Sequence, residues 1–210
     1  MGRDTGPKDR QSRRIGEKLF LKGERDLTSK SGITRRNYPP GLHGPKGYTR
    51  KGSEYGRQLI AKQKVKKMYR LREKQFNNLF VKAGKLKGDA STNLLILLER
   101  RFDNVIYRLG LATSRDQARQ LVTHGHFLVN GTKLNIPSYE VQIKDVITIR
   151  DKSKDNGLIS RTLKEFAGKN MPAWLSFDAS KAEAVIIDLP SVEELSLLAD
   201  ATLTVEFYSR

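Results

Sequence analysis

Residues 111–150 read LATSRDQARQLVTHGHFLVNGTKLNIPSYEVQIKDVITIR and carry the strongest structural signals in the chain. The run from Ser114 to Gln117 has the form of a capping box, in which the serine hydroxyl accepts a hydrogen bond from the third helical amide and the glutamine reaches back. A short helix should therefore begin here. Arg115 and Arg119 are four residues apart, so they should share one exposed face of that helix.

The second half of the same stretch predicts a small antiparallel sheet. Residues 126–129 form a strand-like run, and Asn130-Gly131 is the dipeptide typical of a type I′ hairpin turn. The chain should return over residues 133–136 and add another strand over 146–149. A basic helix face beside such a hairpin suits A-form RNA, which is recognised by its shape and its backbone.

The distribution of charge points to the same class of partner. The 210 residues include 40 Lys+Arg and 23 Asp+Glu, a formal net charge of +17. Residues 1–74 hold 22 basic and 7 acidic residues, a net of +15, whereas residues 176–210 hold 2 and 7, a net of −5. A basic excess of this size favours a polyanion, because each neutralised phosphate releases counterions. The acidic segment should face protein or solvent.

A basic arm and two helices are expected ahead of the hairpin. Residues 1–52 are too polar to order alone, so they form either a solvated disordered arm or, as we prefer, an arm that orders on a polyanion. Ser53 should cap a helix that continues to residue 83 with one apolar and one basic face. A second, more apolar helix should span residues 93–109.

Several classes of protein are disfavoured. No run of 18 or more residues is apolar, and the polar N-terminus lacks the apolar core of a secretory signal. The chain has no cysteine and no Gly-rich phosphate loop. Its three histidines, His43, His124 and His126, have no carboxylate cluster at metal-ligand spacing. We therefore expect no catalytic residues, no metal and no cofactor.

Residues 109–131 resemble the RNA-binding module named for ribosomal small-subunit protein four. Motifs that follow in order along the rest of the chain resemble the ribosomal protein four family itself: PGLHG at 40–44, YGRQL at 55–59, LERRFDNV at 98–105, PAWL at 172–175 and TVEFYSR at 204–210. The resemblance covers essentially the full length. It departs from the family pattern in lacking the cysteine zinc knuckle of many members, and in having Lys144-Asp145 where Gly-Asp is usual.

The resemblance implies a structural constituent of the small ribosomal subunit, in a cytoplasmic or an organellar ribosome. Members of the family bind early to the five-prime domain of small-subunit ribosomal RNA, nucleate assembly and contribute to translational accuracy. They contact ribosomal protein five and, with protein three, line the channel by which messenger RNA enters. No membrane partner is implied.

The same resemblance assigns candidate RNA-binding residues. Lys46, Arg50 and Lys51 match the basic loop that faces the messenger RNA. The RNA face of the module corresponds to Ser114, Arg115, Gln117, Arg119, His124, Asn130 and Lys133. The basic arm and the first long helix supply the remaining candidates: Arg3, Arg13, Arg14, Arg35, Arg36, His43, Tyr55, Arg57, Gln58, Lys62, Lys66, Lys67, Arg70, Arg72 and Lys74.

The sequence thus predicts an α+β fold in four segments. A basic N-terminal arm (1–52) precedes a mainly helical domain (53–98) and an inserted RNA-binding module of short helices packed on a small antiparallel β-sheet (99–175). A C-terminal segment (176–210) should return to the helical domain. Two other classes stay open: a ribosome-rescue or regulatory RNA binder, which the long basic arm disfavours, and a membrane-surface protein, which gives the hairpin no role.

Overall fold

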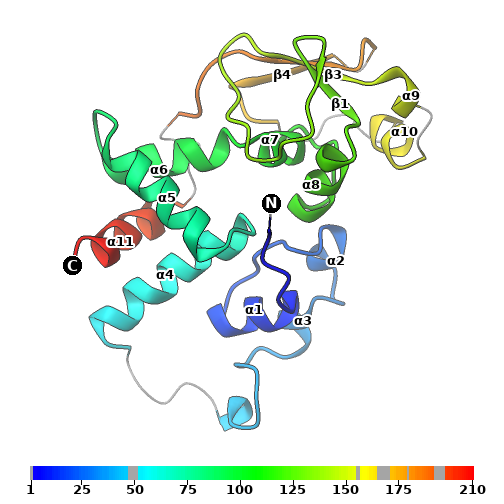
Figure 1. Ribbon diagram of the computed structural model, residues 1–210. Helices are drawn as coiled ribbons and strands as arrows, with labels where there is room; N and C mark the ends of the chain where they lie inside the picture. The colour runs from blue at the N-terminus through cyan, green and yellow to red at the C-terminus, as the bar shows by residue number, and fades with distance from the viewer. Residues whose placement is uncertain (1, 47–51, 155–156, 165–170, 179, 192–196) are drawn as a thin grey trace. The chain divides into compact units, whose positions relative to one another are not determined.

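The computed structural model in Figure 1 describes residues 2–46, 52–154, 157–164, 171–178, 180–191 and 197–210. The chain divides into two compact units. The helical unit comprises residues 1–95 and 197–210, and the sheet unit comprises residues 96–196. Helices and one antiparallel sheet are therefore both present, and the predicted α+β class is confirmed.

The helical unit is built around α4 (Glu54–Met68) and α11 (Leu198–Tyr208), which pack along each other (Figure 1). Ser53 caps α4 as predicted, because its hydroxyl accepts a hydrogen bond from the Gly56 amide at 3.2 Å. The other elements of the unit are α1 (Lys8–Ile15), α2 (Glu24–Leu27), α3 (Gly32–Arg35), the 3₁₀ turn η1 (Gly44–Lys46), α5 (Glu73–Gly84) and the first part of α6 (Ala90–Glu99).

The single helix predicted over residues 53–83 is wrong, because α4 and α5 are separate helices. The chain leaves the helical conformation at Arg70, whose φ is +57°. A long-range contact accounts for the break: the Arg70 carbonyl accepts a hydrogen bond from the Asp4 amide at 3.2 Å. Tyr69 and Leu71 on either side are buried, so the break seats two apolar side chains in the core.

The N-terminal arm also differs from its prediction. Residues 2–46 contain three short helices, and α1 contacts both α3 and α4. The arm carries few apolar residues, but Leu19, Leu21 and Ile33 are buried, at 0, 3 and 7% exposure. These three side chains give the arm a small apolar anchor within the helical unit.

The sheet unit holds a five-stranded antiparallel sheet with strand order β2-β1-β3-β5-β4. Its strands are β1 (Phe127–Val129), β2 (Thr132–Lys133), β3 (Val146–Ile149), β4 (Leu175–Asp178) and β5 (Glu183–Ile186). Helices α7 (Phe102–Arg108) and α8 (Arg115–Thr123) pack against it through one shared core, in which the rings of Phe102 and Phe127 meet edge to face (Figure 1). Two short helices, α9 (Asp151–Lys154) and α10 (Gly157–Lys164), follow β3.

The hairpin prediction is confirmed at its turn, since Asn130 and Gly131 have φ values of +49° and +79°. The returning strand is shorter than predicted and covers only residues 132–133. The structure also continues the sheet beyond the expected boundary at residue 175, because β5 pairs with β3. The C-terminal part that packs on α4 is α11, so residues 176–186 belong with the sheet and not with the helical unit. Trp174 is 4% exposed and packs in the same core.

The predicted helix over 93–109 is likewise interrupted, between α6 and α7. The Val141 amide donates to the carbonyl of Arg100, and the Phe102 amide donates to the carbonyl of Tyr139. An incoming loop therefore takes up the backbone groups that a continuous helix would have used. This turn places the start of α7, with its charged side chains, inside the sheet unit.

Lys144→Gly should raise the free energy of unfolding by about 1 kcal/mol, because Lys144 sits at a φ of +71° that glycine adopts without steric strain. The exposed side chain contributes no packing, and the bond from its amide to the Ile186 carbonyl would be kept. Urea denaturation measures the gain. Lys144→Ala is the control, since it removes the charge but keeps the strained backbone. A gain equal to that of the glycine variant would contradict the backbone explanation.

Candidate RNA-binding surface

The structure sorts the predicted RNA-binding residues by exposure. Thirteen are exposed: Arg3, Arg14, Arg35, Arg36, His43, Lys46, Tyr55, Arg57, Arg72, Lys74, His124, Asn130 and Lys133. Five are half-buried: Arg13, Lys66, Lys67, Arg115 and Gln117. Five are buried: Gln58, Lys62, Arg70, Ser114 and Arg119. Arg50 and Lys51 lie outside the described residues.

The buried members in the helical unit have partners within the protein. Lys62, 7% exposed, places Nζ 2.8 Å from Oε1 of Glu73 and 4.3 Å from the ring centre of Phe207 on α11. Arg70, 4% exposed, donates from Nη1 to Oε1 of Gln11 at 3.0 Å. These cations hold elements of the unit together, so their predicted contact with RNA could only be indirect.

Glu73 is the centre of the contacts that fasten α11. Its carboxylate accepts from Lys62, from Lys66 at 2.6 Å and from the Tyr208 hydroxyl at 2.7 Å. Burial alone would raise the pKa of Glu73, but these three hydrogen bonds outweigh it and lower the pKa from 4.5 to about 2. Burial, together with the same contact, raises the pKa of Tyr208.

The depressed pKa of Glu73 predicts acid sensitivity. Since the folded state favours the charged carboxylate, the stabilisation is present above pH 4.5 and is lost as the pH falls towards about 2. The side chain is 48% exposed, so solvent screening reduces the contribution to about 1 kcal/mol. Glu73→Gln should flatten the dependence of unfolding free energy on pH in this window. Glu24→Gln, an exposed acid of the same unit, should not; equal flattening by both would contradict the role of Glu73.

Lys64 is a structural residue that the sequence did not single out. Its Nζ lies 2.7 Å from Oε2 of Glu17 in the arm and 2.8 Å from Oδ2 of Asp200 on α11. Burial lowers the pKa of Lys64, but the hydrogen bonds from Asp200 and Glu17 exceed that effect and raise it. One cation on α4 thus joins the arm to the C-terminal helix. Only the three-dimensional contact reveals it, because the partners lie far apart in the sequence.

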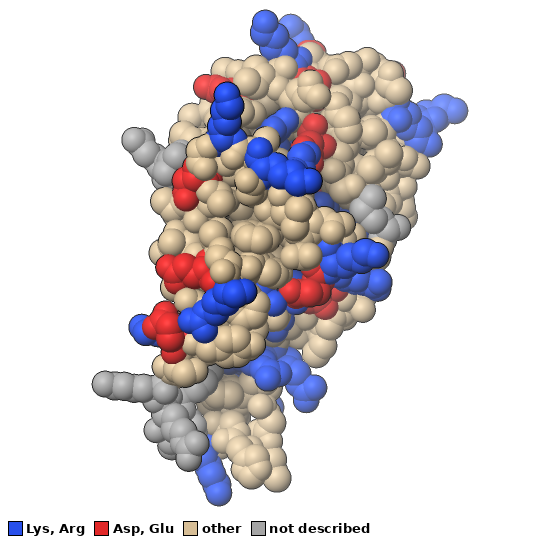
Figure 2. All heavy atoms as spheres, turned by 60° about the vertical axis from the view of Figure 1, so that its left-hand side comes forward, with Lys and Arg blue, Asp and Glu red and all other residues tan. Residues whose placement is uncertain are grey.

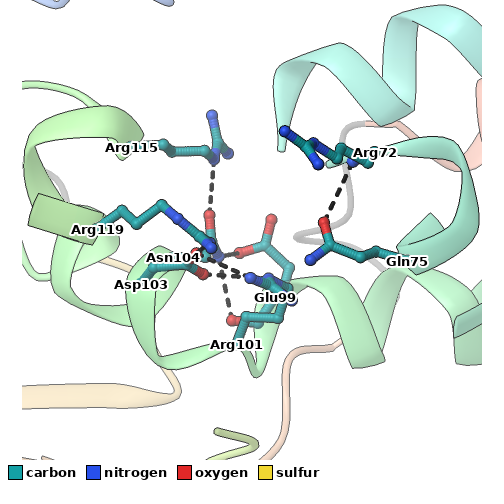
Figure 3. Close-up of polar contacts among 8 residues, drawn as sticks. All are labelled: Arg72, Gln75, Glu99, Arg101, Asp103, Asn104, Arg115 and Arg119. Atoms are coloured by element: carbon teal, nitrogen blue, oxygen red, sulfur yellow. Dashed lines mark hydrogen bonds and ion pairs between the residues drawn. The ribbon is translucent and has the colours of Figure 1, made fainter. Parts of the chain in front are cut away.

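In the sheet unit, a buried acid holds two arginines (Figure 3). Asp103 on α7 accepts from Arg101 at 3.1 and 2.8 Å and from Nη1 of Arg119 at 2.9 Å. The three residues are 6, 4 and 6% exposed. The prediction that Arg119 lies on an exposed face is therefore wrong: the carboxylate of Asp103 draws its guanidinium into the protein.

A second polar chain positions Arg115. Glu99, 3% exposed, accepts two hydrogen bonds from Arg108 at 2.8 and 2.6 Å and one from Nδ2 of Asn104 at 2.7 Å. Oδ1 of Asn104 in turn accepts from Nε of Arg115 at 2.8 Å (Figure 3). The guanidinium of Arg115 also lies 4.6 Å from the ring centre of Tyr107. This hydrogen-bond chain was not predicted from the sequence, although Glu99 and Asn104 both lie in the run LERRFDNV.

The remaining module residues fix the local geometry. Ser114 Oγ accepts from the Gln117 amide at 3.3 Å, as predicted, but the Gln117 side chain accepts from Thr113 and does not reach back to Ser114. Asn130 Nδ2 donates to Asp145 at 2.9 Å, and this bond ties the hairpin turn to the start of β3. Lys133 is exposed on β2.

His124 and His126 lie between α8 and β1 of the module. The rings of His124 and His126 lie 6.0 Å apart, and Nδ1 of His126 is 2.9 Å from the hydroxyl of Ser153. Burial, with the neighbouring charges of His124 and Arg150, lowers the pKa of His126. Within the described ranges, no three His, Asp or Glu side chains come together as a metal site would require.

The surface charge is mixed, and many basic groups are paired. On the face drawn in Figure 2, basic side chains stand beside acidic ones. The Arg57–Glu54 and Lys154–Asp151 pairs are exposed examples. Exposed pairs of this kind contribute little to stability and can be exchanged for phosphate contacts at low cost. Within the described residues, no helix is long and apolar enough to cross a membrane.

Comparison with known proteins finds relatives over the full length of the chain. A family model described as Ribosomal protein S4/S9 N-terminal domain matches residues 3–99, and one described as S4 domain matches residues 100–147. The chain is 50% identical, over 100% of both chains, to the Small ribosomal subunit protein uS4 of Syntrophomonas wolfei and to that of Desulforamulus reducens. It is 48% identical over both full lengths to the protein of that name from Acetivibrio thermocellus.

Proposed function

This chain belongs to the uS4 family of small ribosomal subunit proteins, and from that premise we propose that it is a primary binder of the five-prime domain of small-subunit ribosomal RNA. As a family member it is a structural, non-enzymatic part of the small ribosomal subunit. In the proposed role it nucleates assembly, because one protein that clamps several RNA helices fixes their mutual arrangement before other components bind.

The observation that carries the proposal is the preorganised Arg115. Its guanidinium is half-buried at the start of α8 and is oriented by Asn104 and by the ring of Tyr107. The amides of the first turn of α8 add a partial positive charge beside it. A cation held in one geometry loses little entropy when a phosphate binds, so this position suits the backbone of a structured RNA.

The proposal extends to the messenger RNA and to two protein partners. The exposed Lys46 follows the motif PGLHG, and with Arg50 and Lys51 it would face messenger RNA at the channel by which it enters the subunit. Contacts with ribosomal proteins five and three would place the chain beside that channel and give it an influence on translational accuracy. As a ribosomal constituent it would work in the cytoplasm.

Arg115→Ala should weaken binding to a transcript of the five-prime domain about tenfold and reduce the salt slope by about one. Filter binding at several salt concentrations measures both quantities. Adding Arg119→Ala would confound the result, because Arg119 is buried against Asp103 and its loss would disturb the fold as well as the surface. Lys181→Ala, an exposed cation of the same unit, is the control. Equal affinities of the Arg115→Ala and Lys181→Ala variants would contradict the assignment of the RNA-binding surface to α8.

A further inference from the structure

A groove of about 790 Å³ lies within the helical unit, between the end of α1, the turn at Pro39-Pro40 and one side of α4. This volume is within the range of small-ligand sites. None of the residues assigned to the RNA face of the module lines the groove, so it is a separate feature of the surface.

The walls of the groove are mainly apolar. Ile15 and the two prolines form one side, and Leu59 and Ile60 of α4 form the other. Ile60 is 51% exposed, so its side chain is available for contact with a ligand in the groove. Rigid proline rings and branched aliphatic side chains offer a planar aromatic ring contact on both faces. An unpaired nucleobase is such a ring. A base in a continuous duplex is stacked between its neighbours, so its faces are not available.

Two cations stand at the same groove. Arg14 on α1 and Lys67 on α4 both line it, and neither has an acidic partner within ion-pair distance among the described residues. Burial lowers the pKa of Lys67, repulsion from Arg14 and Lys66 lowers it further, and attraction to Asp4 offsets only part of this. The groove therefore carries an excess of positive charge that an anion would relieve.

We infer that this groove holds one unpaired nucleotide of the bound RNA, with its base between the proline turn and α4 and its phosphate between Arg14 and Lys67. Gln63 lies on the same side of α4, and its amide can both donate to and accept from a base edge. The inference rests on the proposed function and deepens it, since it adds the reading of a single-stranded position to contacts with a paired backbone. An acidic peptide without an aromatic residue would satisfy the cations but would leave the apolar walls uncovered.

The absence of cysteine allows a direct test. Ile60→Cys places one thiol in the groove, and Val81→Cys places one on α5 at similar exposure, 48 against 51%. The rate of maleimide labelling is measured for each full-length variant with and without a saturating transcript of the five-prime domain. We expect at least a tenfold slower rate at position 60 and less than a twofold change at position 81. Equal protection, or none at position 60, overturns the inference.

Affinity provides a second readout that does not depend on a thiol. Gly56→Leu fills the groove without removing a charge, and an added Cβ would meet only the Ser53 hydroxyl, at 3.4 Å. Arg14→Gln with Lys67→Gln removes the two cations, and the exposed pair Lys18→Gln with Lys30→Gln is the charge-matched control.

We expect at least tenfold weaker binding of the transcript for both groove variants and less than threefold for the control. A control as weak as the double groove variant would assign the loss to net charge and overturn the inference. If the unmodified protein binds the transcript tightly but the thiol of Ile60→Cys stays accessible, the groove inference is overturned and the proposed function stands. If the unmodified protein does not bind the transcript, both the proposed function and the inference are overturned.

Discussion

Asp103→Ala is expected to lower the free energy of unfolding by about 3–5 kcal/mol, the largest stability effect of a single substitution that we predict. The carboxylate of Asp103 is the partner of both Arg101 and Arg119, and all three side chains are less than a tenth exposed. Removing it takes away the carboxylate that two buried guanidinium groups share. Urea denaturation followed by circular dichroism measures the loss, and the midpoint should fall without a change in slope.

The control for this effect is an ion pair of the same chemistry at the surface. Asp151 pairs with Lys154 at 2.8 Å, but its side chain is 93% exposed. Asp151→Ala should therefore leave the free energy of unfolding almost unchanged. If the two substitutions destabilise the protein equally, burial of the Asp103 cluster does not determine its contribution. If Asp103→Ala together with Arg119→Met recovers stability, the loss came from the uncompensated charge and not from the missing contacts.

The affinity for the five-prime domain transcript should fall about 10³-fold or more between 50 and 200 mM salt. Nine of the predicted RNA-binding cations are exposed: Arg3, Arg14, Arg35, Arg36, Lys46, Arg57, Arg72, Lys74 and Lys133. Contacts of this number with phosphates release enough counterions to give that dependence. A titration repeated at four or more salt concentrations yields the slope of log affinity against log salt.

The same slope distinguishes exposed from buried cations. Lys62 and Arg70 are occupied by Glu73 and Gln11, so neutralising either one should not reduce the slope, whatever it does to stability. Arg36→Gln should reduce it by about one. A shallow slope for the unmodified protein, equivalent to one or two phosphates, would contradict the phosphate clamp.

The sequence predicted the features that local chemistry determines. The positive φ values at Asn130-Gly131 follow from the dipeptide, and Ser53 and Ser114 cap their helices because a serine needs only the amide three residues on. The helix after Ser114, the hairpin turn and the strand over 146–149 were therefore predicted correctly. The concentration of basic residues in the first third of the chain is also a property of the sequence alone, and it is sufficient to indicate a polyanion partner.

The failures concern contacts between residues that lie far apart in the chain. The helix breaks near Arg70 and Arg100 are set by backbone partners at Asp4 and Val141. Strand β5 pairs with the distant strand β3 and with its neighbour β4, and neither β4 nor β5 was predicted. Arg119 was predicted to be exposed because helical spacing shows which residues share a face but does not reveal a buried acid such as Asp103.

The most direct test of the central claim is a titration of the purified full-length protein against a transcript of the five-prime domain of small-subunit ribosomal RNA, with an unrelated structured RNA of equal length as competitor. The proposed function predicts tight binding that an excess of competitor does not displace. Equal affinity for the two RNAs would contradict it, because the basic surface would then act as a general binder of polyanions.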